Sequence, residues 1–170
     1  EGVLYAEIAA LANDATFKQR SITDGSNDTI RILHNNISNE VRGFSQLSGT
    51  TQGDIRYELN SILLYSKICF KYKLNDYSLW VNGFEVGTDT GSTPIGLSTL
   101  EFANGSGTEN FYGKVKCVAV FKEALTDEEL AKITSVTQQE VFYEMRDRML
   151  QIDADYYEFG DYTTRLKKLF

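Results

Sequence analysis

Short apolar runs separated by clusters of small polar residues make up the first 121 positions of the chain. Runs in which Val, Ile, Tyr, Phe and Thr alternate with polar residues are typical of half-buried β-strands. The pattern predicts strands at residues 3–11, 17–23, 29–34, 40–47, 54–59, 63–73, 97–103 and 112–121. Two further runs, within residues 76–88, flank Asn82 and Gly83, a pair that accepts the positive φ angles of a type I′ turn and so predicts a hairpin.

The periodicity changes from strand-like to helical after Phe121. Thr126 and Glu129 have the spacing of a capping box, in which each side chain bonds the backbone of the other, so we expect a short helix ending near Thr134. The fold class predicted is therefore mainly β, with residues 1–134 forming the β domain and residues 135–170 a separate helical tail.

Apolar residues in the tail recur at alternating intervals of three and four. Such a repeat forms the seam of a coiled coil or of a helix lying along a partner. Two interpretations stay open, a helix that folds back on its own domain and a seam through which several chains oligomerise. The residues of the predicted oligomer seam are Phe142, Met145, Met149, Ile152, Tyr156 and Phe159.

Charge and composition exclude some partners. The formal net charge of -7 argues against binding to a nucleic-acid backbone. No stretch is apolar for long enough to insert in a membrane. Cys69 and Cys117 are too few for a disulfide framework, so we expect two buried thiols, with a bridge between neighbouring strands as the alternative. Because the chain opens directly on the run at residues 3–11, we expect a piece whose upstream strands lie outside this sequence.

Three stretches, in this order, resemble a known family: SLWVNGFEVGT, LSTLEFANG and FYGKVKCVAVFKEALTDEEL. Residues 1–134 are similar to the laminin-G-like, concanavalin-A-like jelly-roll domains, antiparallel two-sheet sandwiches found in lectins and glucanases. The last stretch looks like the closing strand and capped helix of that fold. The positions that match are Gly113, Val115, Val118, Val120, Phe121, Ala124, Leu125, Thr126, Glu129 and Leu130. This version also resembles domains of bacteriophage tail fibres and other virion adhesins, which commonly trimerise.

The resemblance implies glycan chemistry, but the sequence has no catalytic pair for it. Related glucanases carry an E-x-D-x-E spacing on one strand, and that spacing does not occur here. Glu85 and Asp89 are better explained as solvated charges at the end of a hairpin. The single histidine, His34, lies in a predicted strand, where we expect no catalytic role. We therefore identify no catalytic residues and expect a domain that is not an enzyme.

Binding a glycan requires an exposed aromatic ring for stacking and polar groups for the sugar hydroxyls. The candidate ligand-binding residues are Tyr77, Trp80, Asn82, Asn104, Asn110 and Tyr112. A core role for Trp80 is the plainer alternative. Many members of the family hold calcium through loop oxygens, so calcium is the one cofactor that the resemblance suggests. Its candidate ligands are Asp24, Asn27 and Asp28, which are also common turn-forming residues.

The function predicted from these observations is a non-catalytic adhesion domain of a phage-type virion fibre that binds a host-surface glycan. Its location would be the virion, outside the cell when it functions, and its partners would include a homotrimer or other virion proteins. A structural decoration or spacer domain of the virion is the first alternative. A glycan-cleaving module is the weaker one, because the carboxylate motif is missing.

Overall fold

A computed structural model of the chain describes residues 1–137, 140 and 146. The chain divides into two compact units, Glu1–Ser135 and Val136–Phe170. The predicted oligomer seam, from Phe142 to Phe159, lies outside the described residues.

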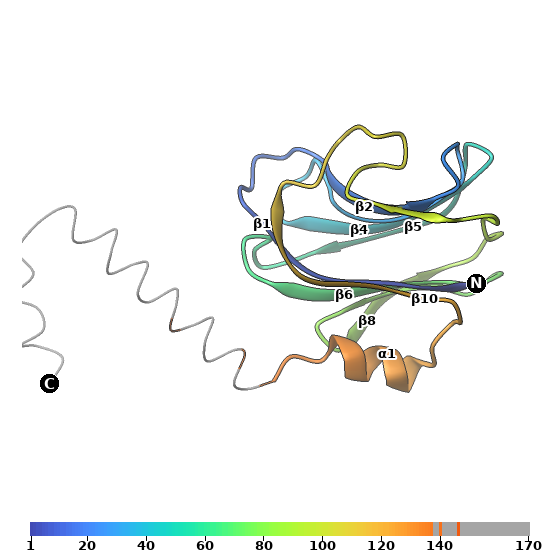
Figure 1. The fold of residues 1–170 in the computed structure, drawn as a ribbon. Helices are drawn as coiled ribbons and strands as arrows, with labels where there is room; N and C mark the ends of the chain where they lie inside the picture. The colour runs from blue at the N-terminus through green and yellow to red at the C-terminus, as the bar shows by residue number, and fades with distance from the viewer. Residues whose placement is uncertain (138–139, 141–145, 147–170) are drawn as a thin grey trace, which may run out of the picture. The chain divides into compact units, whose positions relative to one another are not determined.

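The first unit is a jelly-roll sandwich of two five-stranded antiparallel sheets, so the predicted fold class is confirmed. The first sheet has the order β10-β1-β6-β7-β8. Its strands are β1 (Gly2–Ala10), β6 (Ser66–Tyr72), β7 (Tyr77–Val81), β8 (Phe84–Asp89) and β10 (Gly113–Phe121). The second has the order β5-β4-β3-β2-β9, with β2 (Lys18–Thr23), β3 (Thr29–His34), β4 (Glu40–Leu47), β5 (Thr50–Glu58) and β9 (Thr99–Glu101). Figure 1 shows the two sheets stacked face to face.

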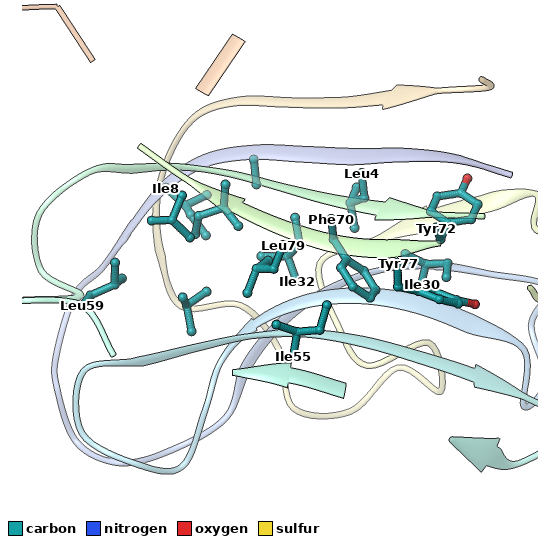
Figure 2. Close-up of a cluster of buried hydrophobic side chains, with 14 of the residues drawn as sticks. Leu4, Ile8, Ile30, Ile32, Ile55, Leu59, Phe70, Tyr72, Tyr77 and Leu79 are labelled. Carbon is teal, nitrogen blue, oxygen red and sulfur yellow. The ribbon is translucent and has the colours of Figure 1, made fainter. Parts of the chain in front are cut away.

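The core fills the space between the two sheets with aliphatic and aromatic side chains from both (Figure 2). Phe70 of β6 is fully buried, and its ring centroid lies 5.7 Å from that of Tyr77. Gly43 of β4 faces this ring, and a Cβ atom at that position would lie 2.5 Å from the Phe70 ring. The absence of a side chain at residue 43 therefore allows the sheets to approach each other around Phe70.

The hairpin and the capped helix both form where the sequence predicts them. Asn82 and Gly83 have φ angles of 50° and 93°, as a type I′ turn requires. Helix α1 (Asp127–Thr134) begins with a complete capping box, in which Thr126 accepts from the backbone amide of Glu129 and Glu129 accepts from that of Thr126. Figure 1 shows α1 against the outer face of the first sheet, where Leu130 packs with Val3, Tyr5, Cys69 and Trp80.

Removal of the Thr126 cap should weaken this packing without breaking the sandwich. We expect Thr126→Ala to lower the free energy of unfolding by about 1 kcal/mol, the usual cost of a lost N-cap hydrogen bond. Denaturant unfolding, followed by the fluorescence of Trp80, would measure the change. Thr90→Ala, at an exposed threonine that follows β8, is the control and should stay within about 0.5 kcal/mol of the parent. Equal losses in the two variants would contradict a role for the cap.

The expectation that both cysteines are buried is wrong. Cys69 is buried, but Cys117 is exposed because it lies on the edge strand β10, and both thiols are free. The alternative interpretation, a bridge between neighbouring strands, is thus excluded. Burial raises the pKa of the Cys69 thiol. His34, a strand residue with no assigned role, faces the interior and is 1% exposed. No helix in the described part of the chain is long and apolar enough to cross a membrane.

Candidate functional site

The outer face of the second sheet carries a row of side chains that crosses all five strands. Antiparallel register places Glu101 of β9 opposite Ser21, Ser21 opposite Arg31, Arg31 opposite Phe44, and Phe44 opposite Asp54. The residues that alternate with them, such as Ile30, Ile32 and Ile55, belong to the core. Since side chains alternate between the two faces of a strand, the row points away from the core. We call Arg31, Phe44, Arg42, Gln19 and Gln46 the arginine face.

Arg31 lies on the central strand β3 and is the cation around which this face is built. Its guanidinium bonds three neutral oxygens: Thr29 Oγ1 at 3.2 Å, Gln46 Oε1 at 3.4 Å and Gln19 Oε1 at 3.5 Å. The last two distances are at the long end of the hydrogen-bond range. Burial lowers the pKa of Arg31, and the neighbouring charge of Glu109 opposes that shift. An arginine keeps its charge under such conditions, so the sheet presents a half-buried cation held by neutral groups.

Phe44 supplies an apolar platform beside that cation. The guanidinium carbon of Arg42 lies 4.4 Å from the centroid of the Phe44 ring, and that of Arg31 lies 5.3 Å from it. Both distances are within the range of cation–π attraction. Phe44 is only 8% exposed, so the ring orients the two arginines more than it offers a stacking surface of its own.

Arg42, unlike Arg31, already has a carboxylate partner. It bonds both oxygens of Asp54, at 2.5 and 2.8 Å, and Arg56 bonds the same carboxylate. Partial burial tends to raise the pKa of Asp54, but the hydrogen bonds from these two arginines outweigh it and hold the pKa below its ordinary value. Asp54 therefore stays ionised and fixes Arg42 in place, which leaves Arg31 as the cation available to a ligand.

A loop between β9 and β10 borders the face on the side of β2. Asn104 organises this loop, since its side-chain oxygen accepts from the backbone amides of Ser106 and Thr108 and its nitrogen bonds Glu109. The Glu109 carboxylate also accepts from Gln19. Glu109 has a positive φ of 54°, an unusual conformation for a non-glycine residue, and this brings its charge next to the arginine face.

The residues predicted to bind a ligand do not form one site. Tyr77 is fully buried, and its hydroxyl bonds Ser45 and the carbonyl oxygen of Ser92. Trp80 is 8% exposed beneath α1. Neither ring can stack against a sugar in this structure, because protein covers both. Asn82 lies at the hairpin of the first sheet and accepts from the backbone amide of Lys67.

The other three predicted ligand-binding residues share the loop that borders the arginine face. The Asn104 side chain donates a hydrogen bond to the Glu109 carboxylate, and Asn110, which follows Glu109 in the chain, is exposed. Tyr112 is 65% exposed and has the most accessible ring of the three aromatic candidates. Asn104, Asn110 and Tyr112 therefore all lie in the loop between β9 and β10. The other three candidates lie in or next to β7, in the other sheet.

The predicted calcium ligands are engaged in a turn between β2 and β3. One oxygen of Asp24 accepts from the amides of Ser26 and Asp28, and Asp28 accepts from the amide of Ser48. Hydrogen bonds from Ser26 hold the pKa of Asp24 below its ordinary value. Asn27 is exposed in the same turn. Within the described residues, no cluster of three or more His, Cys, Asp or Glu side chains is placed to hold a metal ion. Calcium binding stays a prediction.

Sequence reasoning missed Arg31, Phe44 and Arg42. The alternation at residues 29–34 correctly places Arg31 on the face opposite Ile30 and Ile32, but the pattern of one strand does not show which residue lies opposite on the next strand. An available signal was the recurrence of arginine on the polar face of three consecutive predicted strands, at residues 31, 42 and 56. Cross-strand neighbours interact, so such a recurrence indicates a shared cationic surface.

Comparisons of the sequence with models of protein families and with curated proteins find no match. Solved structures do match the fold. The carbohydrate-binding module CBM40 of the Ruminococcus gnavus IT-sialidase, bound to α2,3-sialyllactose, aligns with a TM-score of 0.64 at 15% identity, over 79% of this chain and 82% of that one. Domain 4 of AbnA, an extracellular arabinanase from Geobacillus stearothermophilus, in complex with arabinotriose, aligns with a TM-score of 0.62 at 12% identity, over 79% and 66%.

An intramolecular trans-sialidase from leech is also similar, with a TM-score of 0.63 at 14% identity. The alignment covers 81% of this chain but 23% of that enzyme. At these identities, the likeness establishes a shared jelly-roll fold. Carbohydrate-binding modules with this fold are thus the class of domain that the chain resembles in structure.

Proposed function

We propose that this domain is a non-catalytic carbohydrate-binding domain that binds a carboxylate-bearing glycan on the arginine face. One observation carries the proposal: among the described residues, Arg31, half-buried at the centre of the sheet, bonds only neutral oxygens, two of them at long distance. A sugar carboxylate can replace those contacts with shorter, charge-assisted hydrogen bonds, which planar guanidinium groups form in pairs. Gln46, half-buried beside Arg31, offers an amide group to sugar hydroxyls, whereas Gln19 is 3% exposed and helps to hold Arg31 in place.

Two further observations support the same function. The structural neighbours include a domain solved with sialyllactose, which carries a carboxylate, and another solved with arabinotriose, which is neutral. The ring of Tyr112 is exposed at the end of the loop that carries Glu109, where a second sugar could stack. Attachment of a virion to a host-surface glycan is the biological setting that the sequence resemblance suggests, and it stays a prediction.

The test is a titration of the full chain with 3′-sialyllactose, followed by calorimetry or amide chemical shifts. Lactose, which lacks the acidic sugar, and arabinotriose are the comparison ligands. We expect saturable binding of sialyllactose, with shifts centred on β3 and β4, and no binding of lactose at the same concentration. Product analysis after prolonged incubation should find the trisaccharide intact. Binding of lactose as tight as that of sialyllactose would contradict a carboxylate-directed site.

Arg31→Gln should weaken the binding of sialyllactose by about tenfold to a hundredfold. That range corresponds to the loss of one charge-assisted contact, worth about 1.5–3 kcal/mol. Lys73→Gln is the matched control, because it removes the same charge from an exposed position outside the arginine face, and its affinity should equal that of the parent. Equal affinity in Arg31→Gln and the parent would overturn the assignment of the carboxylate to Arg31.

A further inference from the structure

The sandwich is open along one side, where the edge strands β9 and β10 lie. Within residues 1–137, each has a hydrogen-bonded neighbour on one side only, β2 for β9 and β1 for β10. On the opposite side, hydrogen bonds connect the two sheets, from the amide of Asp54 to Asp89 and from the amide of Ser92 to Gln52. Along β9 and β10, the backbone edges of both sheets are therefore available for pairing.

A cleft of about 490 Å³ lies between these two edges. Its lining comes from both sheets and is mainly apolar, with Ile22 and Leu100 of the second sheet, Tyr72 and Val120 of the first, and Ile95 and Leu97 of the connecting loop. Two charged residues of opposite sign, Glu1 and Lys122, also line it. The volume is typical of a site that holds a few side chains of a ligand.

The side chains along this opening point inward but remain exposed. Val120 lies opposite Leu4, Val115 opposite Ile8, and Leu100 opposite Ile22, and all three of those partners are core residues. Even so, Val120 is 41% exposed, Leu100 is 42% exposed and Ile95, in the loop, is 77% exposed. We call Ile95, Leu100, Val115 and Val120 the open seam. Its three strand residues have the orientation of core residues, and no strand within residues 1–137 covers them.

The charges along β10 select the kind of strand that fits. Residues 113–122 include Lys114, Lys116 and Lys122 and no acidic residue, although the whole chain carries a net charge of -7. Lys116 forms an ion pair with Glu7 of the neighbouring strand β1 at 3.0 Å. A second copy of β10 paired along this edge would bring two sets of lysines together, which is unfavourable, whereas acidic side chains would complement them.

We propose that the open seam binds an extended segment of a partner protein in which acidic and apolar residues alternate. The segment adds a strand to the free edge of β10, its apolar side chains fill the cleft, and its acidic side chains face the lysines. Backbone pairing supplies general affinity in such strand addition, and the pockets for alternate side chains supply specificity. The seam shares no residue with the arginine face, so this site does not depend on the proposed glycan binding.

The test uses the isotope-labelled full chain and a blocked peptide of about six residues in which glutamate and valine alternate. Titration should give saturable shifts of the backbone amides of β10, together with slower hydrogen exchange of those amides. The same peptide with lysine in place of glutamate should bind at least about tenfold more weakly. Absence of saturable binding at millimolar peptide, or equal binding of the lysine peptide, would overturn the proposal.

A pair of variants separates the seam from non-specific adsorption. Val120→Glu places a charge in the apolar cleft, and we expect it to weaken peptide binding at least about tenfold. Phe84→Glu, at an exposed position of the other edge strand of the same sheet, should bind as the parent does. Thermal unfolding checks that both variants remain folded. A dimer of the parent chain that Val120→Glu abolishes would assign the seam to a second copy and overturn the partner proposed here.

Discussion

Replacement of Phe70 by alanine is expected to lower the free energy of unfolding by about 3–5 kcal/mol, the range for a fully buried phenylalanine. The ring lies between the sheets, where it contacts Tyr77 and occupies the space above Gly43. The backbone at Gly43 is hydrogen-bonded within the sheet to β3 on one side and to β5 on the other. It can therefore move only partly into the cavity that the missing ring leaves.

Urea or guanidinium denaturation of the two proteins would measure this loss. Phe84→Ala is the matched control, since Phe84 is 73% exposed on β8 and its replacement should change the free energy by less than about 0.5 kcal/mol. A loss below about 1.5 kcal/mol for Phe70→Ala would show that the sheets close around the missing ring, and would contradict a rigid core at this point.

Lowering the pH from 7 to 5 should destabilise the fold by about 2 kcal/mol through His34. Burial, together with the charges of Arg20 and Lys18, lowers the pKa of His34 from 6.5 to about 2. Neither ring nitrogen has a hydrogen-bond partner among the described residues. Below about pH 6.5, the unfolded chain therefore takes up a proton at His34 that the folded chain does not. The contribution of His34 to the free energy of unfolding is complete above that pH and decreases steadily below it.

His34→Leu supplies the comparison for this pH effect. Leucine cannot titrate, so the free energy of unfolding of this variant should change by less than about 0.5 kcal/mol over the same range. Asp14, Asp24 and Asp54 also have lowered pKa values, but their ordinary value of 3.8 places their contribution below this window. Parallel pH curves for the parent and the variant would show that His34 is not the source.

The strands were predictable because each is marked by its own local pattern. Ile30 and Ile32 alternate with Arg31 in a run that the structure assigns to β3, and Asn82 with Gly83 defines the β7–β8 hairpin. The capping box at Thr126 needs only residues within four positions of one another. Such signals depend on neighbours in the chain, and they therefore survive without knowledge of the tertiary structure.

The candidate site was not predictable in the same way, because it depends on which strands pair. Arg31 and Phe44 become neighbours only through the register of β3 with β4. Trp80 illustrates the same limit: the alternation correctly separates it from Leu79 and Val81, but the face it occupies is covered by Leu130 of α1. The pattern of a single strand predicts which residues share a face, but it does not predict which of the two faces is exposed to solvent.

The arginine face and the core share the same strands, with Arg31 between Ile30 and Ile32 and with Phe44 next to Gly43. Because the two sets of side chains project in opposite directions, each can be exchanged while the other is kept. The half-buried and exposed outward positions of β3 to β5, which are Arg31, Arg42, Gln46 and Arg56 among others, are thus a surface that can be diversified on a constant interior. Libraries at these positions offer a route to binders of new glycans in which stability is set by one set of residues and specificity by the other.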